Sequence, residues 1–188
     1  MGAEQLEEFR HQVLKIEQQA ADLTAGLTEA QFNWRPAPEQ WSIEECLAHL
    51  IIVGQWEARA IEQAIQDGRA RALTGNGPFH YGTIERFIVD ASAVGPDGRP
   101  RRRFSSPRTF VPLHGQPITA VVPTFRHLQR QLGILIDGAE GLDLARVKVK
   151  TPISRFLKLS LGMMFAQIVA HEQRHMAQAL RVRENLPA

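Results

Sequence analysis

The segment IVAHEQRHMAQ, residues 168–178, contains two histidines four residues apart, His171 and His175. On a helix, side chains at this spacing lie on one face, so both imidazoles can reach a single metal ion. Neutral imidazole is the commonest protein ligand for zinc, and it also binds nickel and iron. The letters H-E-x-x-H match the zinc motif of metalloproteases, which makes a protease the first hypothesis to test.

The residues that follow do not fit a metalloprotease. The extended form of that site has Gly and His three and six residues after the second His, where this chain has Gln178 and Arg181. The one downstream carboxylate, Glu184, lies about 13 Å beyond His175 along the same predicted helix. The third ligand is therefore expected upstream of His171.

The composition is that of an ordinary globular protein. The chain has 188 residues, of which 44% are hydrophobic and 22% charged, and this fits a single domain over residues 1–188. Its apolar runs are shorter than the roughly 18 residues of a membrane span, and its N-terminus is polar where a signal peptide needs an apolar block. A single cysteine, Cys46, agrees with a reducing compartment. We therefore expect a cytoplasmic protein that does not bind membranes.

Hydrophobic residues recur at three- and four-residue steps in four segments, which is typical of helices with one buried face. The predicted helices cover residues 4–25, 43–66, 119–136 and 160–184. The second begins with a capping box, Ser42-Ile43-Glu44-Glu45, whose side chains satisfy the first free amides of a helix. Residues 68–117 are rich in Gly, Pro and Arg and predict a long irregular crossover. The sequence therefore predicts an all-α four-helix bundle.

His49 best fits the position of the third ligand. It lies in the apolar middle of the predicted helix 43–66, whereas His80 and His114 fall in the crossover. His49 is about 10 Å into its helix, and His175 is about 14 Å before the end of the last helix. These depths match if the second and fourth helices are antiparallel. Because a short connector also makes the first and second helices antiparallel, the predicted order is up-down-down-up, with one long crossover between the second and third helices.

The segments FNWRPAPEQWSIEECLAHL and IVAHEQRHMAQ together resemble the DinB/YfiT-like superfamily. The resemblance covers most of the chain, and it implies an up-down-down-up bundle, commonly a homodimer, in which three histidines bind a divalent metal ion such as zinc, nickel or iron. By this resemblance the metal ligands are His49, His171 and His175, the set that the spacing favours. The family motif is H-x-x-x-H, so Glu172 is expected to be incidental to the site.

Two kinds of function follow from such a site. Three protein ligands leave a coordination position open, as in catalytic metal centres. The resemblance implies either a metal-dependent hydrolase or a transferase that activates a low-molecular-weight thiol, with a small molecule as substrate in both cases. The alternative is a non-catalytic, stress-associated helical bundle in which the metal stabilises the fold.

The crossover holds the one concentration of basic residues. These are Arg99, Arg101, Arg102, Arg103 and Arg108. A solvated loop is the simpler interpretation, while a lid that holds the charged groups of a thiol is the alternative. Because the net charge is only +2 and no aromatic side chains are interleaved at stacking spacing, we expect no nucleic-acid partner. Within the crossover, GTIERFIVDASA is predicted as a short helix and RRRFSSPRTFVP as extended chain.

Three further features bear on the site and on assembly. Cys46, one turn before His49, offers an alternative fourth ligand that would make the site structural. Gln178, one turn after His175, is expected either to orient a ligand or to meet a backbone carbonyl. The 43–66 helix is apolar around more of its surface than one core requires, which predicts a homodimer.

Overall fold

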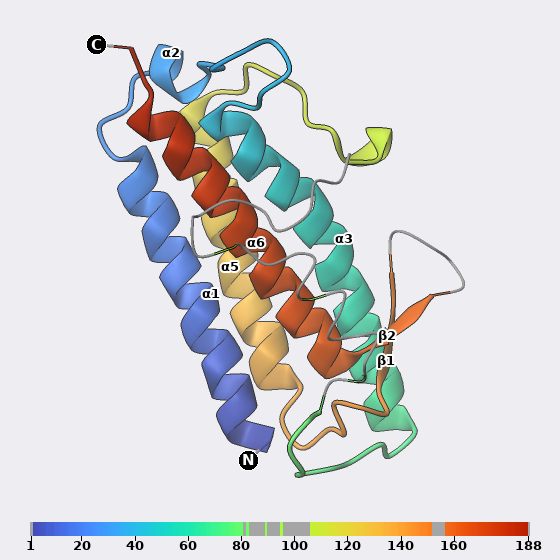
Figure 1. The fold of residues 1–188 in the computed structure, drawn as a ribbon. Coiled ribbons are helices and arrows are strands. Elements are labelled where there is room, and N and C mark those ends of the chain that lie inside the picture. The colour runs from blue at the N-terminus through green and yellow to red at the C-terminus, as the bar shows by residue number, and fades with distance from the viewer. Residues whose placement is uncertain are drawn as a thin grey trace.

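The computed structural model of the chain describes residues 2–80, 106–151 and 157–187, together with residues 82, 89 and 95. Four long helices pack against one another (Figure 1), and they are α1 (Gly2–Thr24), α3 (Ile43–Ala70), α5 (Ile118–Gly138) and α6 (Leu161–Glu184). The shorter elements are α2 (Glu29–Phe32), the 3-10 helix η1 (Arg108–Phe110), β1 (Lys148–Lys150) and β2 (Lys158–Ser160). The predicted all-α bundle is confirmed. In the described part of the chain, no helix has the length and hydropathy of a membrane span.

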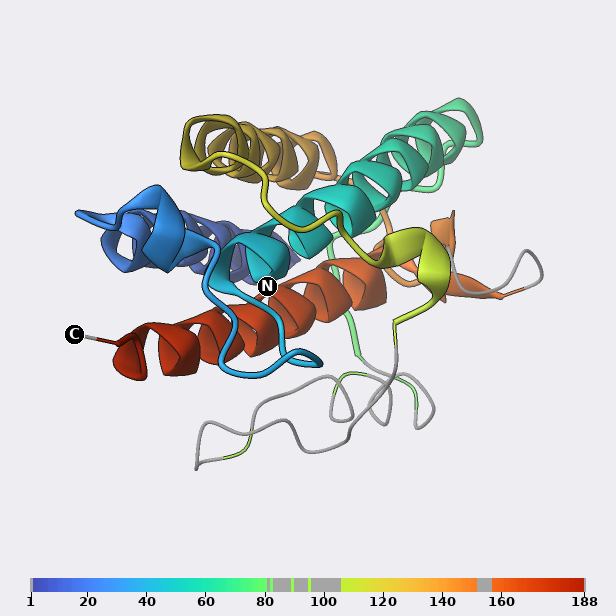
Figure 2. The same cartoon turned by 90° about the horizontal axis from the view of Figure 1, so that it is seen from above.

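The order of the helices is up-down-down-up, as predicted. Helices α1 and α6 run in one direction and α3 and α5 in the other (Figure 1). Seen from above, α1 and α3 occupy diagonal corners, and each packs against both α5 and α6 (Figure 2). Helices α3 and α6 are therefore antiparallel neighbours, which is the arrangement that a shared histidine site requires.

Helix α3 starts where the predicted capping box places it. Ser42 Oγ accepts a hydrogen bond from the Glu45 amide at 3.1 Å, and Glu45 Oε2 accepts one from the Ser42 amide at 3.0 Å. This reciprocal pair satisfies two of the amides that a helix start leaves free. The helix continues to Ala70, so the predicted end at residue 66 was too early. The cap holds the first two turns of α3, which carry His49.

The segment between α5 and α6 contains a hairpin that the sequence did not predict. Strands β1 and β2 are antiparallel, and Val149 pairs with Leu159. Val149 is fully buried, and β1 packs against α3. The hairpin therefore covers part of the surface of α3. The homodimer stays a prediction.

The predictions made for the crossover fall mainly outside the described residues. This holds for the short helix expected over residues 82–93 and for Arg99 and Arg101 to Arg103. The extended conformation expected up to Pro112 was wrong at Arg108–Phe110, which forms a turn of 3-10 helix, whereas Val111 is extended as predicted. This turn brings the backbone of the crossover onto α3, close to the histidines.

Two helical glycines provide a matched test of the packing between α3 and α5. A Cβ atom at Gly54 would lie 2.6 Å from Leu128 Cδ2 in the core, whereas a Cβ at Gly133 would meet no other part of the described structure within 4 Å. We expect Gly133→Ala to stabilise the fold by about 0.5–1 kcal/mol, because alanine is the better helix former. Gly54→Ala should destabilise it by roughly 1 kcal/mol or more, because overpacking outweighs that gain. Urea denaturation of both variants tests this, and stabilisation by Gly54→Ala would contradict the close packing.

Candidate metal centre

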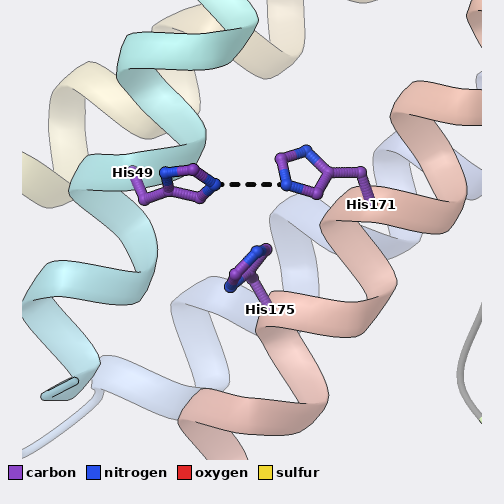
Figure 3. A group of neighbouring side chains, drawn as sticks. All are labelled: His49, His171 and His175. Atoms are coloured by element: carbon purple, nitrogen blue, oxygen red, sulfur yellow. Dashed lines mark hydrogen bonds between the residues drawn. The ribbon is translucent and has the colours of Figure 1, made fainter. Parts of the chain in front are cut away.

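The three histidines singled out by the sequence lie together between α3 and α6. His49 comes from the second turn of α3, and His171 and His175 come from successive turns of α6 (Figure 3). Their rings converge, and one ring nitrogen from each residue lies within 4.8 Å of the corresponding nitrogens of the other two. His49 Nε2 and His171 Nε2 are 3.2 Å apart. The antiparallel packing of α3 and α6 thus brings residues 122 positions apart into one cluster.

The geometry fits a metal ion with nitrogen ligands. Two imidazole nitrogens that bind one zinc ion at about 2.0–2.1 Å in tetrahedral geometry are separated by about 3.3 Å. The distance of 3.2 Å between His49 Nε2 and His171 Nε2 is close to this value. In addition, His175 Nδ1 is buried and has no hydrogen-bond partner among the described residues. Buried polar atoms are normally satisfied, so the histidine cluster fits a bound ion.

The electrostatics of the cluster keep its imidazoles neutral. Burial lowers the pKa of His49, and it lowers the pKa of His171 to about 3. The pKa of His175 lies well below its ordinary value, mainly through burial and then through the charges that His171 and His49 would carry. Neutral imidazole is the form that binds a metal, so these ligands need not lose a proton at neutral pH.

A backbone carbonyl fixes the orientation of His49. Its Nδ1 lies 2.8 Å from the carbonyl oxygen of Phe110 in η1. Because a carbonyl only accepts, Nδ1 carries the proton and donates it, which leaves the Nε2 lone pair facing His171. Metal-binding histidines commonly have such a partner on the second ring nitrogen. No sequence motif predicts this contact, since it involves the main chain of Phe110.

The segment of residues 108–116, here called the docking arm, is fastened to the start of α3. Glu44 is buried, and its carboxylate accepts hydrogen bonds from the Gly115 amide at 3.2 Å and from Gln116 Nε2 at 3.0 Å. His114 Nδ1 lies 3.4 Å from Glu45 Oε2. Glu45 also receives two hydrogen bonds from the guanidinium of Arg35. The carboxylates of Glu44 and Glu45 therefore both contact the docking arm, and that of Glu45 also caps the helix start.

Removal of the Glu44 carboxylate should loosen the docking arm. Glu44→Ala leaves the Gly115 amide and the Gln116 side chain without their acceptor, which should cost about 1–3 kcal/mol of folding free energy. We expect faster amide hydrogen exchange at Gly115, with much less change at the exposed control variant Glu39→Ala. Unaltered exchange at Gly115 in the Glu44 variant would show that the arm is held by other contacts.

Trp41 forms an aromatic wall of the cluster. Its ring centroid lies 4.9 Å from that of His49 and 5.7 Å from that of His175, on which it stacks. No pattern in the sequence indicates that Trp41 is part of the site. Because the residue directly precedes the Ser42 cap, its position is set by the start of α3.

Other residues considered from the sequence lie outside the cluster. Cys46 is fully buried, burial raises the pKa of its thiol, and its sulfur does not join the three nitrogens. The alternative of a cysteine as fourth ligand is therefore not supported. Gln178 is half-buried one turn after His175 and raises the pKa of that residue, and its role at the site stays a prediction. Glu172 is buried and accepts a hydrogen bond from Gln129 of α5 at 2.7 Å, so it contacts the core as expected for a residue incidental to the site.

The family comparison agrees with this fold and cluster. A family model described as the DinB superfamily matches residues 12–179, which include all three histidines. The chain belongs to the DinB superfamily. A search of curated proteins finds no significant match. Membership in the superfamily confirms the resemblance seen in the sequence and, together with the buried histidine cluster, is compatible with binding of a divalent metal ion.

Proposed function

We propose that His49, His171 and His175 bind one divalent ion, zinc, nickel or iron, and that the protein is a metal-dependent enzyme acting on a small molecule. The observation that carries this proposal is the unequal burial of the three ligands. His49 and His175 are 3% and 8% exposed, whereas His171 is only half-buried. A structural site is normally closed by four protein ligands, while three ligands with an accessible side are typical of catalytic sites.

Between the two enzyme classes, transfer of a thiol is favoured over hydrolysis. Among the described residues, no carboxylate joins the histidine cluster to serve as a general base for water. Glu172 contacts Gln129 in the core, and Glu44 and Glu45 hold the docking arm. A divalent ion at the cluster would supply a Lewis acid that favours the ionised form of a thiol, which then needs no protein base. The residues of the chain hold the histidines in place, because Trp41 packs against His49 and His175 and the Phe110 carbonyl orients His49.

A pair of activity assays with metal-loaded protein tests this proposal. One measures conjugation of a simple thiol to an activated aryl halide, and the other measures hydrolysis of an activated ester. We expect conjugation that depends on the metal and is lost in His171→Ala. If the loaded protein shows neither activity while the metal raises its melting temperature, the structural role of the metal would replace this proposal.

We also propose that the protein is a homodimer and that it is located in the cytoplasm. The described surface does include large exposed apolar side chains, among them Leu14 at 55% and Ile134 at 70% exposure, on α1 and α5. A contact between two chains would cover such residues. These exposed side chains support a dimer contact on α1 and α5, which we propose in place of α3.

A further inference from the structure

The docking arm contacts α3 at two positions that are five residues apart on the helix. At one end of the arm, the carbonyl oxygen of Phe110 lies 2.8 Å from Nδ1 of the proposed metal ligand His49. At the other end, Glu44 accepts hydrogen bonds from the Gly115 amide at 3.2 Å and from Gln116 Nε2 at 3.0 Å. The chain then continues to the start of α5, at the same end of the bundle as the start of α3 (Figure 1). The arm therefore connects Glu44 to His49.

The position of Glu44 on α3 separates its side chain from the histidine cluster. Five residues along a helix correspond to a rotation of about 140° and a rise of about 7.5 Å, so Glu44 and His49 point to different sides of α3. The carboxylate of Glu44 contacts the docking arm, at Gly115, at Gln116 and, at 4.0 Å, at His114 Nδ1. Apart from its charge, Glu44 can therefore affect His49 only through the arm.

Polar contacts hold the docking arm, because little of its apolar surface is buried. Val111 is 47% exposed and Leu113 is 81% exposed, and Pro112 alone is buried among residues 108–116. A segment with few buried apolar contacts opens locally at a small cost in free energy. Gly115, at the contact with Glu44, has a φ of +91°, a left-handed conformation that favours glycine. Loss of the hydrogen bonds to Glu44 should therefore release the arm, and the Phe110 carbonyl with it.

We propose that Glu44 is a positioning residue for the metal ligand His49 and that it acts through the docking arm. With the arm in place, the Phe110 carbonyl accepts the Nδ1 proton of His49, and the Nε2 lone pair faces His171. Without the arm, both tautomers of the neutral ring become accessible, and one of them carries its proton on Nε2, where the metal would bind. This inference rests on the proposed function, and it names a residue outside the cluster that keeps one ligand in the form that binds a metal.

The first test compares zinc affinities of the full-length protein by competition with a chromophoric chelator at pH 7.5. We expect Glu44→Ala to lower the affinity about tenfold, at the lower end of the effect of residues that orient a metal ligand. Glu44→Gln, which keeps one acceptor oxygen without the charge, should retain part of the affinity. Gly115→Ala strains the backbone at the same contact and changes no charge, so it should also lower the affinity, by a smaller factor.

The second test determines the tautomer of His49 in the metal-free protein from the ¹⁵N chemical shifts of its ring nitrogens. The wild type should show one tautomer, with the proton on Nδ1, and Glu44→Ala should show a mixture of the two. The matched control is Val13→Ala, which weakens the core at a buried position of α1. It should keep both the zinc affinity and the His49 tautomer of the wild type, because α1 lies apart from the arm.

Three results would overturn the inference while the metal site stands. They are an unchanged zinc affinity in Glu44→Ala, an unchanged His49 tautomer in that variant, and equal losses in Glu44→Ala and Glu44→Gln with none in Gly115→Ala. The last result would show that Glu44 acts by its charge alone. A wild-type protein that binds no zinc at the histidine cluster would overturn the proposed function and this inference together.

Discussion

Replacement of His171 by alanine is expected to lower the affinity for zinc by more than about 100-fold. Loss of a residue that only orients a metal ligand already lowers metal affinity about 10- to 100-fold. His171 supplies one of the three proposed ligand nitrogens itself, so its loss should have a larger effect. Because His171 is the half-buried member of the cluster, its removal should disturb the fold less than removal of His49 or His175. The affinity is measured by competition with a chromophoric chelator at pH 7.5.

The control for this prediction is His127→Ala, which removes an exposed histidine from α5, outside the cluster. Its affinity for zinc should equal that of the wild type, and both variants should keep the helical circular dichroism spectrum. Similar zinc affinities for the wild type and the His171 variant would show that the cluster is not the metal site.

Substitution of Glu57 by glutamine should stabilise the protein increasingly as the pH rises from about 4.5 to 8. Glu57 of α3 is 6% exposed, and burial, followed by the charge of Glu172, raises its pKa to about 8. The native state therefore keeps a proton that the unfolded chain releases above its ordinary pKa of 4.5. Because the native state binds more protons in this range, wild-type stability falls as the pH rises, and a glutamine escapes this loss. The advantage of the variant should grow by roughly 1 kcal/mol per pH unit.

Chemical denaturation at pH 5 and pH 8 measures this difference. The matched control is Glu62→Gln, at an exposed position on the same helix, whose stability difference from the wild type should be small at both values. If the advantage of the Glu57 variant were the same at pH 5 and pH 8, Glu57 would ionise in the fold as it does in the unfolded chain. Burial beside Glu172 would then not raise the pKa of Glu57.

The sequence was sufficient for the helices and for the histidines because both depend on local patterns. The capping box from Ser42 to Glu45 lies within four residues, and the spacing of His171 and His175 is one helical turn. His49 was singled out because it lies in the apolar middle of its predicted helix, at a depth that matches His175 if the two helices are antiparallel. Each of these features could be predicted because the regular geometry of a helix fixes the direction and the height of every side chain along it.

The surroundings of the site could not be predicted in the same way. The carbonyl of Phe110 that orients His49 has no side-chain signature, and the contact spans 61 residues. Glu44 looked like part of a helix start, yet its carboxylate holds Gly115 and Gln116, more than 70 residues away. The strands of the hairpin have only three residues each, too few to show an alternating pattern. These features depend on tertiary packing, and the structure was needed to find them.

The most direct test of the account is the metal content of the protein after purification without an affinity tag and reconstitution with zinc, nickel or iron. Inductively coupled plasma mass spectrometry should find about one equivalent of metal per chain in the wild type and close to none in the His49→Ala and His171→Ala variants. A wild-type protein that stays empty after reconstitution, or variants that keep their metal, would contradict the proposal that His49, His171 and His175 form a metal centre.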